Sequence, residues 1–162
     1  YETQRAILGD VVAALHLQGI RKLIIVNGHG GNSFKNMIRD LSVDFPDFLI
    51  AITNWYGIVP QEGYFENKDD HAGELETSVM MYYHPELVNL EEAGEGTSKP
   101  FALSSLNAQI AWLPRYWSKV SADTGIGDPR KSTPEKGERY AKAVIEKLAL
   151  LFTEIGSKEV YL

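Results

Sequence analysis

Apolar residues in the first third of the chain follow two periods, which predict alternating helices and strands. They recur at helical spacing from Glu2 to Leu17 and again from Phe34 to Leu41, which predicts two amphipathic helices. Each of these segments is followed by a short apolar run rich in β-branched residues, at Lys22 to Val26 and at Phe48 to Ile52. Such runs are typical of strands buried on both faces of a parallel sheet. The order helix, strand, helix, strand indicates right-handed crossovers and a layered α/β fold.

The rest of the chain is less regular until its final helix. Glycines, prolines and charged residues after Thr53 predict a long loop, and long loops in compact domains are often functional. Apolar spacing from Leu75 to Tyr83 predicts a third helix, and a strong amphipathic helix is predicted from about Thr133 to Ile155. With 162 residues and no linker or internal repeat, we expect a single domain over residues 1–162.

Composition narrows the classes of partner and of metal ligand. The net charge is −6 and no run rich in Lys and Arg is present, so nucleic acid is not an expected partner. The longest apolar run is far too short for a membrane span and no signal segment opens the chain, which favours a cytoplasmic protein without membrane contact. Because cysteine is absent, the candidate metal ligands are His, Asp and Glu. The chain begins at Tyr1 rather than at a methionine, and we therefore expect a piece of a longer protein.

The first candidate site is the turn Asn27-Gly28-His29-Gly30-Gly31-Asn32, which follows one predicted strand and precedes a predicted helix. Ligands often bind at this edge of an open α/β sheet, and His29 would offer an imidazole to a metal there. A plain connecting turn is the alternative, whereas a phosphate cradle is disfavoured because the glycine spacing fits neither phosphate-binding motif. Trp55 follows the second predicted strand at the same edge, where it forms either a pocket wall or part of the core.

The second candidate site contains His71, Glu74 and Glu76, at the predicted start of the third helix. The two glutamates lie two positions apart, about 200° around a helix axis, so they cannot point the same way within regular helix. Helix capping by Asp69 or Asp70, with Glu74 in the first turn, would explain part of this cluster without any catalysis. Capping leaves Glu76 unexplained, because this carboxylate stands close to an apolar face and is costly to bury unless it is paired or bound to a cation.

Together these segments resemble the signature motifs of the creatininase, or creatinine amidohydrolase, family. Asn-Gly-His-Gly-Gly-Asn at 27–32 and His-Ala-Gly-Glu-x-Glu-Thr-Ser at 71–78 are similar to those motifs in sequence and in order, and the likeness continues through residues 124–129 and 133–137. The resemblance implies a three-layer α/β/α sandwich with a mainly parallel sheet, often assembled as a homohexamer. It also implies two divalent metal ions per complete subunit, zinc, manganese or iron, and hydrolysis of a C–N bond in a small cyclic amide or formamide.

The resemblance also implies roles for individual residues. His29 and Glu76 match metal ligands, and His71 matches a histidine that lies near the substrate and transfers a proton. Glu74 stands where the creatinine-cleaving enzyme has an apolar residue, while that enzyme has a Glu where this chain has Gly31. This exchange suggests Glu74 as the acid/base residue. The opposite assignment stays open, in which Glu74 is the ligand and Glu76 is structural.

The substrate side and the set of metal ligands depart from the family. Trp55 matches one aromatic residue of the substrate pocket, but Gly30 and Asn67 stand in the places of others, so creatinine is not the expected substrate. The family's further Glu-x-His and its bridging Asp belong to an N-terminal segment that has no match here. We therefore expect the remaining ligands upstream of Tyr1 or on a separate chain.

The sequence supports a metal-dependent amidohydrolase in which a hydroxide held between two metal ions attacks a small amide. One alternative is a non-catalytic fragment or interaction subunit that retains the fold. A nucleotide-binding module is the weakest alternative, because no phosphate-binding lysine accompanies the glycines.

Overall fold

The computed structural model describes residues 1–67 and 69–161, which pack as two compact units. The first unit comprises Tyr1–Val59 and Val144–Leu162, and the second comprises Pro60–Ala143. The C-terminal helix α6, Pro134–Ser157, contributes residues to both units.

The first unit contains the parallel sheet. Helix α1 spans Glu2–Leu17, strand β1 Lys22–Asn27, helix α2 Lys35–Asp44 and strand β2 Leu49–Asn54. The two strands pair in parallel with Lys22 opposite Leu49 and Asn27 opposite Asn54. These elements confirm the alternation predicted from the apolar periods, with boundaries shifted by at most three residues.

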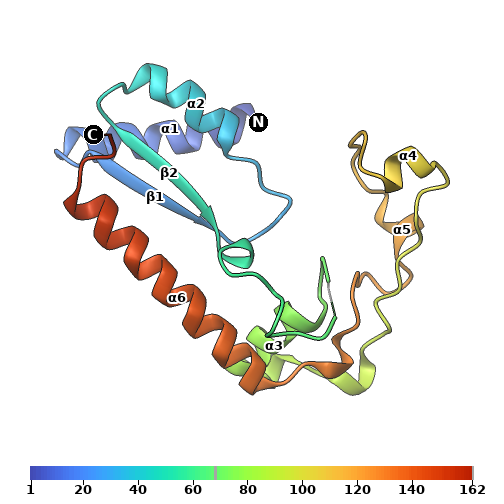
Figure 1. Cartoon of the computed structure of the whole chain (residues 1–162). Coiled ribbons are helices and arrows are strands. Elements are labelled where there is room, and N and C mark those ends of the chain that lie inside the picture. Colours follow the sequence, from blue (N-terminus) through green and yellow to red (C-terminus); the bar gives the residue numbers. More distant parts are fainter. Residues whose placement is uncertain (68, 162) are drawn as a thin grey trace. The chain divides into compact units, whose positions relative to one another are not determined.

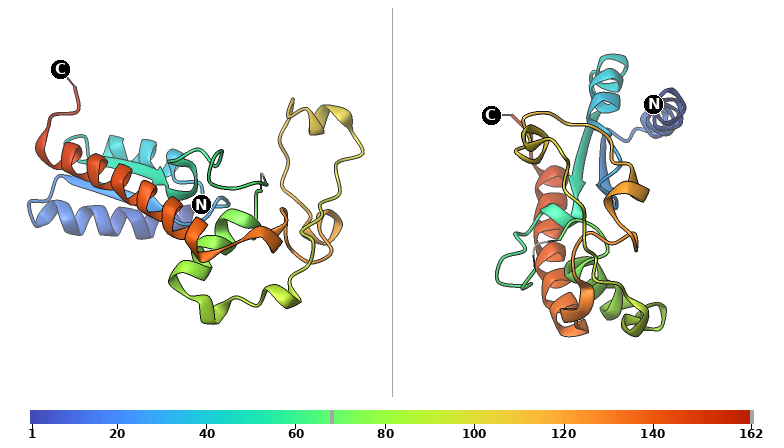
Figure 2. Two further views of the ribbon diagram at one scale, coloured as in Figure 1. Left: turned by 60° about the horizontal axis from the view of Figure 1, so that its bottom comes forward. Right: turned by 90° about the vertical axis from the view of Figure 1, so that its right-hand side faces the viewer.

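The helices of this unit cover both faces of the two strands. The core on one face consists of buried residues from α1, α2 and the region of β2, namely Val12, Leu41, Phe48 and Ile50. On the other face the ammonium group of Lys22 donates a hydrogen bond to the carbonyl oxygen of Ile155 in α6, at 2.6 Å. Figures 1 and 2 show α1 and α2 on one side of the strands and the C-terminal part of α6 on the other. The unit is therefore layered as helix, sheet, helix.

The prediction that β1 is buried on both faces is wrong. Val26 is 45% exposed, and Leu23 and Ile25 are only half-buried. Among the described residues the sheet has two strands, so neither strand has neighbours along both edges. The apolar run predicted the correct element but not the extent of its burial among the described residues.

The second unit is built around α3, Glu74–Tyr83, and the first turns of α6. Two further short helices, α4 at Ser104–Asn107 and α5 at Trp117–Val120, lie between them in the sequence. Short 3₁₀ helices occur in the first unit at Trp55–Gly57 and in the second at Pro85–Leu87, Leu90–Glu92 and Pro129–Lys131. The predicted third and final helices are confirmed, and the connection between them is long and mostly irregular.

Helices α3 and α6 approach each other closely at Gly137. A Cβ atom at this position would overlap the carbonyl oxygen of Ser78 on α3. One turn before it, the backbone N–H of Thr133 donates to the hydroxyl of Ser78, at 3.2 Å. One turn after it, the buried ring of Tyr140 contacts the ring of Phe65, with centroids 5.2 Å apart. The glycine is thus required for backbone contact between the two helices.

Within residues 1–67 and 69–161, none of the helices combines the length and the apolar character that a membrane span needs.

We expect Gly137→Ala to destabilise the protein by about 1–3 kcal/mol or more, in the range of overpacked cores, because backbone atoms cannot yield as a flexible side chain can. Gly156→Ala, near the end of the same helix, is the matched control, since its Cβ would enter open space. Alanine there should stabilise the helix by up to about 1 kcal/mol. Denaturant unfolding of both variants measures the difference, and equal free energies of unfolding would contradict the close helix contact.

Candidate functional site

The side chain of Asn27 organises the glycine turn at the carboxyl end of β1. Asn27 is 4% exposed, and its amide group donates to the carbonyl oxygen of His29 and to the side chain of Asn54, each at 2.9 Å. Its side-chain oxygen accepts from the side chain of Asn32 at 3.0 Å and from the backbone N–H of His29 at 3.3 Å. One buried amide therefore ties the turn to itself and to the end of β2.

His29 is exposed within this turn and folds back on it. The backbone N–H of Gly31 donates to Nδ1 of His29 at 2.9 Å. A Cβ at Gly31 would lie 2.9 Å from both Nδ1 and Cε1 of that ring, so the contact depends on glycine. This hydrogen bond occupies the one lone pair of Nδ1, so His29 can bind a metal through Nδ1 only when the contact with Gly31 is broken.

Trp55 lies at the same sheet edge as His29, as its position after β2 predicts. Its indole N–H donates to the carbonyl oxygen of Gly28 at 3.3 Å, and its ring meets Tyr56 edge to face, with centroids 6.2 Å apart. A Cβ at Gly30 would lie 3.7 Å from the hydroxyl of Tyr56. Trp55 therefore lies against the turn that contains His29 and Gly30 rather than in the core.

His71 and Glu76 come together at the start of α3. Nδ1 of His71 lies 3.9 Å from Oε2 of Glu76, and each side chain is about one-third exposed. The backbone of His71 is fixed by an antiparallel bridge with Ile126, with hydrogen bonds of 3.0 and 2.8 Å. Oε2 of Glu76 accepts from the backbone N–H of Ala72 at 2.7 Å, one residue before the N-cap Gly73, and so ties this carboxylate to the segment that leads into α3.

Glu74 points in a different direction and is completely buried. Its Oε2 accepts from the backbone N–H groups of Glu66 and Asn67, each at 2.9 Å, and its Oε1 accepts from the ammonium group of Lys136 at 2.5 Å. This hydrogen bond is the main reason why the pKa of Lys136 is raised, with Glu66 adding to it. Asn67 thus contributes a backbone donor to this cluster.

The sequence places Glu76 close to an apolar face, but Glu76 is about one-third exposed, and Glu74 is the carboxylate that is buried. The prediction that the two glutamates diverge around the helix is confirmed. The first helical residue faces inward because the loop at residues 66–67 and the start of α6 both supply donors to it. Sequence reasoning missed Lys136 as the partner of Glu74, although Lys136 lies in the segment 133–137 whose likeness to the family was visible.

Asp69 caps α3, as the capping alternative predicted. Its carboxylate accepts from the backbone N–H of Leu75 at 2.8 Å, and a Cβ at either Gly73 or Gly127 would overlap the Asp69 side chain. Burial raises the pKa of Asp69, and the neighbouring carboxylates, Glu76 first among them, raise it further. Two glycines therefore make room for a carboxylate that is held in a partly apolar setting.

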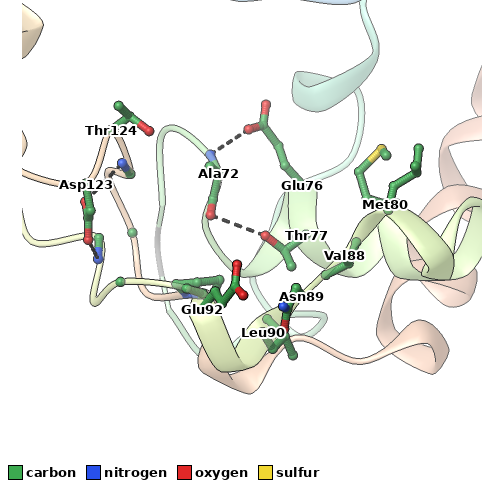
Figure 3. Close-up of a pocket in the computed structure, with 17 residues that line it drawn as sticks. Ala72, Glu76, Thr77, Met80, Val88, Asn89, Leu90, Glu92, Asp123 and Thr124 are labelled. Atoms are coloured by element: carbon green, nitrogen blue, oxygen red, sulfur yellow. Dashed lines mark hydrogen bonds between the residues drawn. The ribbon is translucent and has the colours of Figure 1, made fainter.

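A cavity of about 450 Å³ lies in the second unit and borders Glu76 (Figure 3). It is lined by the start of α3, by the segment from Leu87 to Gly96 and by the segment from Asp123 to Pro129. Glu76, Glu92 and Asp123 line it, and its lining contains neither Lys nor Arg. Hydrogen bonds from the backbone N–H of Gly96, and from neighbouring donors, lower the pKa of Asp123. The cavity is therefore anionic.

The predicted site residues fall into two groups. His29, Gly30 and Trp55 lie in the first unit, and Asn67, His71, Glu74 and Glu76 lie in the second. His71 and Glu76 are brought together, while Glu74 is engaged elsewhere. Over the described ranges, 1–67 and 69–161, no group of three or more His, Asp or Glu side chains is arranged to hold a metal ion.

Comparison with known proteins identifies the family. The family model described as "Creatininase: Creatinine amidohydrolase" matches residues 1–152. The chain belongs to the creatininase family. A crystal structure from Bacteroides fragilis NCTC 9343, named as a candidate creatinine amidohydrolase, is 61% identical and superposes with a TM-score of 0.97, over 100% of this chain and 64% of that one. The predicted creatininase-like α/β fold is thereby confirmed.

Two further relatives are more distant members. The mycofactocin precursor peptide peptidase of Mycobacterium ulcerans (strain Agy99) is 30% identical over 129 residues, which cover 77% of this chain and 45% of that protein. A creatininase structure described as a Zn-Zn type is 22% identical with a TM-score of 0.74, over 93% of this chain and 62% of that one. The chain therefore spans about half to two-thirds of the length of these relatives.

We expect Asp69→Ala to lower the free energy of unfolding by about 0.5–2 kcal/mol, because the Leu75 N–H loses its cap. Asp69→Asn is the matched control, since it keeps an acceptor oxygen and removes the partly buried charge. Because the folded-state pKa of Asp69 is raised, the charged form disfavours folding, and stability is expected to fall as pH rises from below 3.8 through the raised value. Denaturant unfolding between pH 3 and 7 should show this fall reduced in Asp69→Asn; an unchanged profile would contradict it.

Proposed function

We propose that the complete protein is a metal-dependent amidohydrolase that cleaves a C–N bond of a small cyclic amide or formamide. The observation that carries the proposal is the pairing of His71 with Glu76, 3.9 Å apart, beside an anionic cavity of about 450 Å³. A carboxylate that lines a cavity of this size, with an imidazole beside it, is typical of a site for a small molecule. Membership of the creatininase family supports the same reaction class.

The donor atoms of His29 and Glu76 fit a divalent metal. One offers an imidazole nitrogen and the other a carboxylate, a combination that zinc, manganese and iron all accept. The Zn-Zn type of one creatininase structure and the manganese form of another support two such ions per complete subunit. When bound, divalent ions polarise an amide carbonyl and lower the pKa of water. Further ligands are expected outside these two residues.

His71 is the proposed acid/base residue, and its environment suits proton transfer. Its ring is one-third exposed, so a substrate can reach it, and its backbone is held by the bridge to Ile126. Glu74 remains a predicted acid/base candidate, but its carboxylate already accepts three hydrogen bonds in a buried setting. That arrangement favours a positioning role for Glu74, which fixes the start of α3 and with it Glu76.

The substrate is proposed to contact Trp55, Gly30 and Asn67. Gly30 and Asn67 stand in place of aromatic residues and would leave more room for the substrate.

A second candidate reaction is cleavage of a peptide amide, which is favoured by the name of the mycobacterial relative. We also propose a homo-oligomer, which sedimentation of the full-length protein would test.

A substrate panel tests the function. The full-length protein, supplied with zinc or manganese, is incubated with N-formyl amines, cyclic imides, creatinine and short peptides. We expect bound metal, turnover of a cyclic amide or formamide that is lost on chelation, and no turnover of creatinine. Turnover of peptides alone would favour the second reaction. Absence of both bound metal and turnover would favour the non-catalytic alternative.

We expect His29→Ala and Glu76→Gln to weaken metal binding in the full-length protein by at least about 100-fold, more than the 10–100-fold loss that removal of an outer partner causes. Elemental analysis and metal titration measure this change. Unchanged metal content in either variant would remove that residue from the set of ligands.

Glu74→Gln should differ in kind from Glu76→Gln. We expect the Glu74→Gln variant to retain metal. Its free energy of unfolding should fall by up to about 3–5 kcal/mol, because the partly exposed ammonium of Lys136 loses its buried partner. The double variant Glu74→Gln with Lys136→Met should recover part of that loss, because no unpaired charge remains. Loss of metal in Glu74→Gln without loss of stability would instead make Glu74 the ligand.

A further inference from the structure

An aromatic residue that the motifs do not contain lies against the imidazole of His71. The ring of Trp117, at the start of α5, is centred 4.9 Å from the ring of His71 and is tilted from it by 57°. Tilted rings at this separation attract each other through the quadrupole of the indole. Trp117 is 42% exposed, so part of its ring remains open.

The position of Trp117 is itself fixed. The guanidinium carbon of Arg115 lies 5.7 Å from the centre of the Trp117 ring, a cation–π distance. The same guanidinium forms an ion pair with Asp70, the residue that precedes His71. Arg115 therefore links the indole to the carboxylate of Asp70, the neighbour of His71 in the chain.

Trp117 belongs to a long, mostly irregular segment between Ser98 and Ser121, the excursion, which leads the chain back to His71. The bridge between Ser98 and Ser121, with a hydrogen bond of 2.7 Å from the N–H of Lys99 to the carbonyl of Val120, closes the base of that excursion. Trp117 lies near this base, and the closure explains why a residue so distant in sequence returns to His71.

The His71 ring is thus constrained from several directions. The bridge to Ile126 holds its backbone, the carboxylate of Glu76 lies 3.9 Å from Nδ1, and the indole of Trp117 packs against the ring. We propose that Trp117 is a positioning residue of the active site, which holds the imidazole of His71 in the orientation needed for proton transfer. This inference rests on the proposed function. An indole in ring contact with the imidazole fulfils this role because its bulk restricts rotation of the imidazole.

The size of the expected effect follows from the precision that proton transfer needs. Misplacement of a reacting group by about 1 Å can cost about 100-fold in rate. A positioning residue should therefore act on kcat, while a residue that binds the substrate should act on KM, and a merely structural residue should lower metal content or stability along with activity.

The experiment compares variants of the full-length protein, loaded with metal, on the substrate that the panel identifies. We expect Trp117→Ala to lower kcat by about 10–100-fold with KM within about twofold and with metal content unchanged. Trp117→Phe should restore kcat to within about threefold of the wild type, because a flat ring is again present. Trp112→Ala is the matched control, since Trp112 lies in the same excursion and is 86% exposed, and it should leave kcat unchanged.

A second measurement does not depend on turnover. The ring-proton resonances of His71, observed by NMR in histidine-labelled protein, should move in Trp117→Ala, because the ring current of the indole is lost, and should stay in place in Trp112→Ala. If Trp117→Ala does not fold, Trp117→Leu takes its place, since leucine keeps apolar volume without a flat ring.

The outcomes separate this inference from the proposed function. A wild type that cleaves no substrate overturns the proposed function, while a shift of the His71 resonances in Trp117→Ala still supports the ring contact on which the positioning role depends. Unmoved resonances, an unchanged kcat, a rise in KM alone, or a loss of kcat that follows loss of metal would each overturn the positioning role.

Discussion

The buried ion pair between Glu74 and Lys136 is the interaction on which the arrangement of the second unit depends. Neither carboxylate oxygen of Glu74 reaches water, so its charge is tolerated only because one ammonium and two backbone N–H groups complete its hydrogen bonds. Those donors come from the loop at residues 66–67 and from the start of α6, and none of these segments can shift without leaving a buried charge unsatisfied. The close contact at Gly137, one residue beyond Lys136, follows from the same constraint. Glu76, two positions after Glu74, is held in place as a consequence.

Most of the regular structure could be predicted from local pattern, because α1, α2, α3 and α6 each carry a helical period of apolar residues within one continuous segment. The irregular region between α3 and α6 could not. Its organisation comes from two isolated bridges, His71 with Ile126 and Ser98 with Ser121, which join residues far apart in sequence and leave no periodic signature. The extent of burial of β1 was also beyond the sequence, since an apolar run specifies a strand but not how many neighbours that strand has.

The candidate site was predictable in its residue types and not in their directions. The glycine turn and the His-Glu-Glu cluster identify which side chains carry chemistry, and the 200° separation shows that the glutamates diverge. Which of the two points inward depends on Lys136, whose position 62 residues later in the chain gives no local signal. Trp117 was invisible for the same reason, because its contact with His71 depends on the closure of a long excursion.

That excursion has a consequence for how sequences of this kind can diverge. Its base is pinned by the bridge between Ser98 and Ser121, and its contacts with His71 and Asp70 come from Trp117 and Arg115 near one end. The outer part, where Ile110 and Trp112 are 79% and 86% exposed, is held by contacts close to it in sequence. Insertions, deletions and substitutions there can accumulate at little thermodynamic cost, since a lengthened loop costs only slowly rising closure entropy. Sequence changes in this outer part therefore leave the surroundings of the His71 imidazole unchanged.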